Sequence, residues 1–252
     1  MTLTGKVTKA AERGPRTYQE DYALIHCIAN GRFAGWLLAI MDGHGGAQTA
    51  QYCRDNLTPL FEQAILMEAI SPEEILRFLV SSLNEQTREF DPGTTISLCL
   101  ILEEEDAAYI AILGDSPVLV VDGFGELHKS PEHNARTNMS DRLEAMQRGA
   151  RYSGGYLETP YGHSLQLSRA LGDMLFDSFL NREPEVYSVK EPRFIAVCSD
   201  GVLDPGHSKT LELADELGEL LKQASSAEDI LEWAGARRLA DNATAILWTT
   251  KE

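Results

Sequence analysis

Four apolar, strand-like segments of this chain each border an aspartate in a turn-like dipeptide. Strands backed by a packed core form a rigid sheet, and turn residues are displayed at the ends of those strands. The pattern therefore predicts a fold in which several carboxylates gather at the rim of a sheet. The segments are LLAIMDGHGG with Asp42, YIAILGDSP with Asp115, FIAVCSDG with Asp200 and DNATAILW with Asp241.

A fifth acidic motif, RTYQED, places Arg16 four residues before the acidic pair Glu20-Asp21. Hard divalent cations prefer several oxygen ligands, which can come from separate parts of a chain. Each motif taken singly is better explained as an ordinary turn, because Asp beside Gly or Asn is common in turns. The metal site is therefore a hypothesis that rests on the whole set.

Composition and charge limit the classes of protein that fit. The 252 residues, of which 43% are hydrophobic and 24% charged, suffice for a large globular core. The formal net charge of −17 argues against nucleic acid or an anionic membrane surface as a partner. The N-terminal segment has no hydrophobic signal core, and no apolar stretch approaches the length of a membrane span.

The four cysteines are widely spaced and form no CxxC pair, which argues against a zinc or thioredoxin-type site. Cys99 and Cys198 lie inside apolar runs, so we expect buried thiols. This cysteine usage predicts a reducing, cytoplasmic compartment.

Periodicity predicts helices separated by short strands. Apolar spacing predicts amphipathic helices over 47–66 and 71–90, and Ser71-Pro72-Glu73-Glu74 has the residues of a capping box. Further helices are expected near 140–149, 209–223 and 226–236, the last with Ser225 and Glu228 as a capping box. Strands are expected at Trp36–Met41, Thr94–Leu102, Ala107–Leu113, Pro117–Val121, Arg193–Cys198 and Ala243–Thr249.

The connections between strands also carry information. The segments 103–106 and 114–116 have the length of hairpin loops. Residues 128–165 are richer in His, Arg, Gly and Ser, which predicts an irregular subdomain. Strands mixed with helix pairs, without strict βαβ alternation, predict an α+β fold with antiparallel sheets.

The motifs RTYQED, MDGHGG, GDS, SRALGD, SDG and DNAT occur in this order between about Arg16 and Trp248. This order resembles the metal-dependent (type 2C, PPM) protein serine/threonine phosphatase family. The resemblance implies one catalytic domain over residues 1–252 with a flap near 128–165. It also implies a four-layer α-β-β-α sandwich, in which two antiparallel sheets are flanked by helix pairs and metals bind at one end.

The resemblance further implies hydrolysis of phosphoserine and phosphothreonine in proteins by a water or hydroxide that bridges two Mg²⁺ or Mn²⁺ ions. At the matching positions Asp42 is the bridging ligand, assisted by the carbonyl of Gly43. The other implied metal ligands are Asp200 and Asp241 at the first ion, Glu20 and Asp21 at the second, and Asp115 with Asp200 at a third, weaker ion.

The same positions imply that Arg16 grips the phosphate and that His44 donates a proton to the leaving serine oxygen. His133 and Asp173 are expected to be supporting residues, and SRALGD to fix the flap against the core. The other histidines, His207 among them, carry no comparable indication. One departure is Pro117, which stands where the family usually has the arginine of GDSR.

The signatures of several other hydrolase classes do not occur in this sequence. A cysteine-based phosphatase needs an arginine six positions after its cysteine, and Arg32 follows Cys27 one position too early. HExxH and P-loop signatures are absent. Two alternatives stay open, namely a pseudophosphatase that binds phosphoproteins without turnover and a phosphoesterase for small molecules. We expect phosphorylated proteins as partners and a monomeric enzyme.

Overall fold

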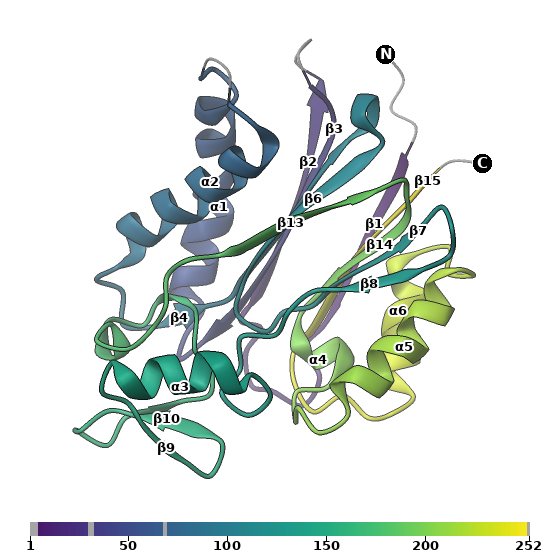
Figure 1. Cartoon of the computed structure of the whole chain (residues 1–252). Helices are drawn as coiled ribbons and strands as arrows, with labels where there is room; N and C mark the ends of the chain where they lie inside the picture. The colour runs from purple at the N-terminus through teal and green to yellow at the C-terminus, as the bar shows by residue number, and fades with distance from the viewer. Residues whose placement is uncertain (1–4, 30–32, 68–69, 251–252) are drawn as a thin grey trace.

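Two antiparallel sheets pack face to face, and a pair of helices covers the outer surface of each (Figure 1). The computed structural model describes residues 5–29, 33–67 and 70–250. One sheet has the order β12-β4-β3-β5-β6-β13 with β2 beside β3, and the other has the order β1-β15-β14-β7-β8. The first contains β2 (Asp21–Ala29), β3 (Ala34–His44), β4 (Gly93–Thr94), β5 (Ile96–Leu102), β6 (Ala107–Leu113), β12 (Leu171–Gly172) and β13 (Glu185–Lys190). The second contains β1 (Gly5–Glu12), β7 (Val118–Asp122), β8 (Leu127–Lys129), β14 (Pro192–Cys198) and β15 (Ala243–Thr250).

Because successive residues of a strand point to opposite faces, the central strands pack against a helix pair on one face and against the other sheet on the opposite face. In β3, Leu37, Ala39 and Met41 join the core under the first helix pair. The alternate residues Leu38 and Ile40 join the core between the two sheets. Such strands are apolar on both faces, as expected from their continuous hydrophobic runs. The predicted four-layer sandwich is therefore confirmed.

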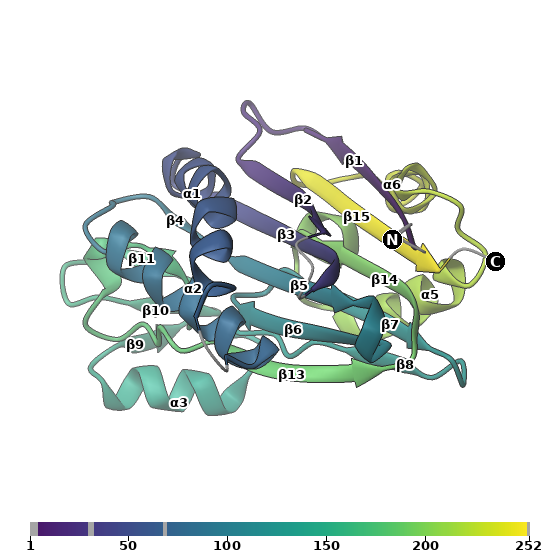
Figure 2. The same ribbon diagram turned by 90° about the horizontal axis from the view of Figure 1, so that it is seen from above.

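The first helix pair, α1 (Gln48–Ala64) and α2 (Pro72–Thr87), covers the β3-β5-β6 face, and the last pair, α5 (Thr210–Leu221) and α6 (Ala227–Gly235), covers the other sheet (Figure 2). All four lie within a few residues of their predicted positions. The Ser71 capping box is confirmed, because Glu74 N–H donates to Ser71 Oγ (3.2 Å) and Ser71 N–H donates to Glu74 Oε2 (2.8 Å).

The capping box predicted before α6 is wrong by one residue. Ser226, not Ser225, is the N-cap residue, and Asp229, not Glu228, accepts the backbone N–H of Ser226 (3.1 Å). Asp229 also accepts the N–H of Ser225 (2.7 Å). Ser225 with Glu228 and Ser226 with Asp229 have the same spacing, so the sequence alone did not show which pair forms the cap.

The connection 114–116 is not a hairpin, in contrast to its predicted role. β6 belongs to the seven-stranded sheet and β7 to the five-stranded sheet, so the chain crosses between the sheets at this point. By contrast, β5 and β6 are antiparallel neighbours joined by a short turn that contains the helix η1 (Glu103–Glu105). The crossing carries Asp115 to the space between the ends of both sheets.

Strands β1, β2, β8 and β13 were not predicted from the sequence. Their side chains are largely half-buried or exposed, and β1 and β13 lie at sheet edges, so their hydrophobic periodicity is weak. No helix within the described segments has the length and apolarity needed to span a bilayer.

The region 128–165 contains helix α3 (Met139–Gln147) and a three-stranded sheet of β9 (Arg151–Ser153), β10 (Tyr156–Glu158) and β11 (Ser164–Leu165). It lies below the ends of the large sheets in Figure 1. Arg169, from the SRALGD motif, donates two hydrogen bonds to Asp141 of α3 (2.8 and 2.9 Å) and one to Glu185 of β13 (3.2 Å). The motif thus ties α3 to the edge of the sandwich.

We expect Ser71→Ala to lower the free energy of unfolding by about 1 kcal/mol, because the first turn of α2 loses its side-chain acceptor. Denaturant unfolding followed by circular dichroism measures the change. Ser81→Ala, at an exposed position within the same helix, is the matched control. An equal effect in both variants would show that the cap contributes nothing specific.

Candidate metal centre and active site

A cleft of about 290 Å³ opens where the two sheets end. Residues from the β1–β2 loop, β3, the β6–β7 crossing, α4 (Asp200–Leu203) and the loop before β15 line it. Eight of the nine site residues predicted from the sequence line this cleft: Arg16, Glu20, Asp42, Gly43, His44, Asp115, Asp200 and Asp241. The ninth, Asp21, lies beneath the cleft wall.

Strand β3 supplies the centre of the site. Its last three residues are Asp42, Gly43 and His44. The Gly43 N–H donates to the Glu20 carbonyl (3.2 Å), and a Cβ at Gly43 would lie 2.7 Å from that same oxygen. Only glycine permits this approach, so the RTYQED loop and the DGH turn are locked together.

Asp21 is buried opposite Asp42 in the β2–β3 register. Its Oδ2 accepts hydrogen bonds from Ser199 Oγ and Thr244 Oγ1, both at 2.8 Å. Its Oδ1 is buried with no hydrogen-bond donor. Asp21 therefore joins β2 to the second sheet and holds negative charge directly behind Asp42.

Asn242, the second residue of the DNAT motif, holds the RTYQED loop. Its Nδ2 donates to the carbonyls of Arg13 (2.8 Å) and Tyr18 (3.0 Å). Its Oδ1 accepts the N–H of Glu20 (2.8 Å). These three bonds fix Glu20 beside Asp241, although the two segments lie at opposite ends of the chain.

The electrostatics of the cleft favour the binding of positive charge. Burial, reinforced by the charges of Asp21 and Asp200, raises the pKa of Asp42 well above its usual range. Burial and Asp200 raise the pKa of Asp115 to about 7, and burial raises that of Asp21 to about 6. Crowded carboxylates of this kind, with a buried oxygen that lacks a donor, fit divalent cations bound through oxygen.

Arg16 pairs with the carboxylate of Asp241 across the mouth of the cleft. Burial raises the pKa of Asp241, as does Asp200, while Arg16 opposes this shift. The guanidinium is half exposed, so it is accessible to a ligand that enters the cleft.

His44 is held by Asp173, the last residue of SRALGD. His44 Nε2 lies 2.7 Å from Asp173 Oδ2, and Asp173 is almost fully buried. Burial would lower the pKa of His44, but Asp173 outweighs this effect and the net shift is upward. Asp173 therefore orients the imidazole and favours its protonated form.

His133 is fully buried, and its Nδ1 accepts the N–H of Gly114 (3.2 Å), so it supports the crossing that carries Asp115. The neighbouring Asn134 lines the cleft and donates to Asp115 Oδ2 (2.8 Å). Asn134 was not among the site residues predicted from the sequence, although it directly follows His133.

His207 is the main site residue that the sequence did not reveal. It is 9% exposed and its Nε2 lies 3.4 Å from Asp115 Oδ2 and 3.5 Å from Asp200 Oδ2. Burial would lower its pKa, but contacts with Asp200 and Glu132 raise it to about 10. No motif pointed to it, because GHS resembles any exposed turn.

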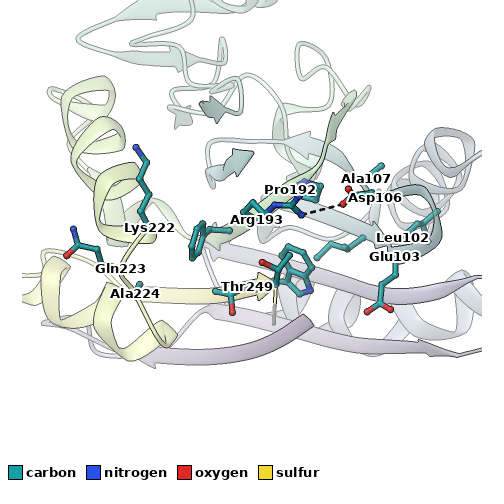
Figure 3. Close-up of a pocket in the computed structure, with 14 residues that line it drawn as sticks. Leu102, Glu103, Asp106, Ala107, Pro192, Arg193, Lys222, Gln223, Ala224 and Thr249 are labelled. Atoms are coloured by element: carbon teal, nitrogen blue, oxygen red, sulfur yellow. Dashed lines mark ion pairs between the residues drawn. The ribbon is translucent and has the colours of Figure 1, made fainter. Parts of the chain in front are cut away.

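A larger cleft, of about 710 Å³, lies at the other end of the sheets, beside the β5–β6 turn (Figure 3). Arg193 reaches Asp106 there at 3.8 Å, while Lys222 lies on the opposite wall. The described residues of this cleft include no histidine and no cluster of carboxylates. This second cleft therefore lacks the set of metal ligands that lines the first cleft.

The fold places crowded oxygen ligands of the kind that divalent cations prefer in one cleft at the ends of two packed sheets. The family model described as "Protein phosphatase 2C" matches residues 22–242. The chain therefore belongs to the protein phosphatase 2C family, the PPM family of metal-dependent serine/threonine phosphatases, and is an enzyme of that class.

Individual relatives agree with this assignment. "Protein phosphatase 2C homolog 1" of Saccharomyces cerevisiae is 23% identical over 92% of this chain and 88% of its own length. Serine-threonine phosphatase 2C from Toxoplasma gondii shares the fold with a TM-score of 0.73 at 16% identity, over 97% of this chain and 94% of that one. The catalytic domain of the phosphatase PstP, solved with two manganese ions, has a TM-score of 0.61 at 18% identity, over 98% and 99%.

We expect Asp42→Asn to stabilise the protein in the presence of a chelator. The pKa of Asp42 is raised in the folded state, so its ionisation costs stability as pH rises above about 4, the unfolded value. The variant should unfold at higher temperature than wild type at pH 8, with the difference fading towards pH 4. With Mn²⁺ the order should reverse, because wild type gains more from the ion.

Asp55→Asn, at a half-exposed position of α1, is the control and should change stability by no more than about 0.5 kcal/mol. Thermal unfolding over the pH range measures all three proteins. A wild-type protein that stays more stable than Asp42→Asn in chelator at pH 8 would contradict this electrostatic account.

Proposed function

We propose that this enzyme hydrolyses phosphoserine and phosphothreonine in proteins with two Mg²⁺ or Mn²⁺ ions. The observation that carries the proposal is the convergence of Asp42, Asp115, Asp200 and Asp241 on one cleft whose buried carboxylates repel one another. Together with Glu20 and the Gly43 carbonyl they offer an all-oxygen ligand set.

Asp42 would be the ligand common to two ions, and the Gly43 carbonyl would fill a further ligand position. Asp200 and Asp241 would complete the site of one ion, and Glu20 and Asp21 would serve the other, directly or through bound water. When bound, the ions neutralise the phosphate charge and lower the pKa of water.

Arg16 is the proposed phosphate clamp. Its guanidinium already lies at the mouth of the cleft, paired with Asp241. Two parallel hydrogen bonds to phosphate oxygens would replace that pair when a substrate enters. Arg16 would then fix the ester so that its serine oxygen faces His44.

His44 is the proposed general acid. A serine alkoxide is a strong base, and the bond to phosphorus breaks more easily when a proton reaches the leaving oxygen. His44 Nε2 is bonded to Asp173, which leaves Nδ1 as the nitrogen available to the substrate. Asp173 keeps the imidazole charged before the proton is transferred.

The complete ligand set supports turnover rather than a pseudophosphatase. A phosphoesterase for small molecules shares the same core chemistry, and only substrate tests separate the two. We also propose a reducing, cytoplasmic location, which the four free cysteines, three of them buried, support, and a monomeric enzyme.

The decisive test is hydrolysis of phosphoserine and phosphothreonine peptides, with small phosphate monoesters assayed in parallel. We expect activity that requires Mn²⁺ or Mg²⁺ and disappears with a chelator. Alkylation of Cys27, the exposed cysteine, should leave the rate unchanged. Full activity in excess chelator would overturn the mechanism, and activity on small esters alone would favour the second alternative.

We expect Asp173→Asn to slow hydrolysis of phosphoserine peptides more than that of p-nitrophenyl phosphate, whose leaving group needs no proton. Loss of a general acid costs about 10²–10⁴-fold where protonation is required, and the loss of its support should cost less. The pKa of His44 should fall without Asp173. As pH rises, the rate of peptide hydrolysis should therefore begin to decline at a lower pH in the variant than in wild type.

His44→Gln should show the same dependence on substrate, and Asp177→Asn, whose carboxylate pairs with Arg88 and Arg182, is the control. Steady-state kinetics over the pH range supplies the measurement. Equal losses on both substrates would assign His44 and Asp173 to the structure of the DGH turn.

A further inference from the structure

Helix α3 exposes a stripe of large apolar side chains. Met139, Leu143 and Met146 are 62%, 44% and 43% exposed, and their spacing along the chain places them on one face of the helix. The helix itself is anchored, because Asp141 pairs with Arg169 and is almost fully buried. An ordered helix with an exposed apolar face of this kind is typical of a surface that binds another protein.

A groove of about 750 Å³ begins at the start of this stripe. Its lining includes Met139 of α3 and Leu211 in the first turn of α5, which is 72% exposed. Deeper in the groove the lining includes the buried apolar residues Val118, Leu119, Leu203 and Ala214. The groove can therefore take up an apolar side chain between α3 and α5.

The groove continues the catalytic cleft, because Asp115 and His207 line both. The cleft, of about 290 Å³, is the smaller of the two. A polypeptide with its phosphoserine in the cleft has to leave over the rim, and the side bounded by these two residues opens into the groove. Pro117 also lines the groove, at the position where the family usually has an arginine, so its compact ring stands in place of a long cation.

The charges in the groove do not oppose an apolar occupant. Glu132 Oε1 lies 2.5 Å from His207 Nδ1, and Lys129 donates to a carboxylate of α5 (2.8 Å). The other two charged side chains at this end of α5, Lys209 and Glu212, have opposite signs. The groove therefore has no excess of one charge that would select a strongly acidic or basic ligand.

We propose that the groove and the stripe of α3, together called the docking surface, bind the segment of a protein substrate next to its phosphoserine. The groove takes up one large apolar side chain of that segment. This inference rests on the proposed function, which places the phosphate in the cleft. An extended chain advances about 3.3–3.6 Å per residue, so the apolar side chain belongs to a residue a few positions from the phosphoserine. A small phosphate ester cannot make this contact.

Binding of phosphopeptide analogues tests the docking surface. Each peptide carries a non-hydrolysable phosphonate in place of phosphoserine, and a single leucine is moved through the neighbouring positions of a sequence of alanine and serine. Fluorescence anisotropy in the presence of Mn²⁺ gives the Kd. We expect leucine at one position to lower the Kd about tenfold relative to alanine, as a buried apolar anchor does. The double variant Met139→Ala, Leu211→Ala should lose this preference.

Leu66→Ala, at an 83% exposed position beyond the end of α1, is the matched control and should retain the leucine preference. The double variant should stay folded because both of its side chains are exposed, and circular dichroism checks this. Hydrolysis of p-nitrophenyl phosphate should be equal in all three proteins. The absence of a leucine preference in wild type, or its persistence in the double variant, would overturn the proposal.

Two further outcomes are distinguishable. A dimer that the double variant loses, in a protein without a leucine preference, would make a second copy of the chain the occupant and refute the proposal. Hydrolysis of the corresponding phosphoserine peptides separates the docking surface from the proposed function. Turnover without a leucine preference in binding would refute the docking surface alone. Leucine-dependent binding without turnover of any peptide would support the docking surface and refute the proposed hydrolysis.

Discussion

Mutual repulsion among buried carboxylates is the constraint on which this structure depends. Burial raises the pKa of Asp42, and the charges of Asp21, Asp200, Asp115 and Asp241 around it raise that pKa further. A protein tolerates such an arrangement only if the surrounding fold is stable enough to impose it. Here the two sheets provide that stability, because each packs between the other sheet and a helix pair. A bound cation relieves the repulsion among the carboxylates, so the repulsion favours cation binding.

Backbone and side-chain hydrogen bonds hold the segments that carry the carboxylates. Gly43 locks β3 to the RTYQED loop, and Asn242 locks that loop to the start of β15. Asp21 joins the two sheets through Ser199 and Thr244. The site thus lies where both sheets end, and its geometry follows from their packing.

Predictions from the sequence succeeded where the signal was local. The helix pairs, the Ser71 cap and the apolar strands follow from periodicity within a window of a few residues. Edge strands such as β1 and β13 were missed because half-exposed positions weaken that periodicity. The segment 114–116 was misjudged because loop length alone does not reveal whether the next strand joins the same sheet.

The sequence by itself determined the family, because the acidic motifs at the ends of apolar strands occur in this order, and it predicted carboxylates as the metal ligands. Only the tertiary structure decided which side chains meet. Arg16 and Asp241 are 225 positions apart, His44 and Asp173 are 129 apart, and His207 joined the site without any motif. Such pairs depend on sheet register and on how the two sheets pack, and no local pattern encodes either.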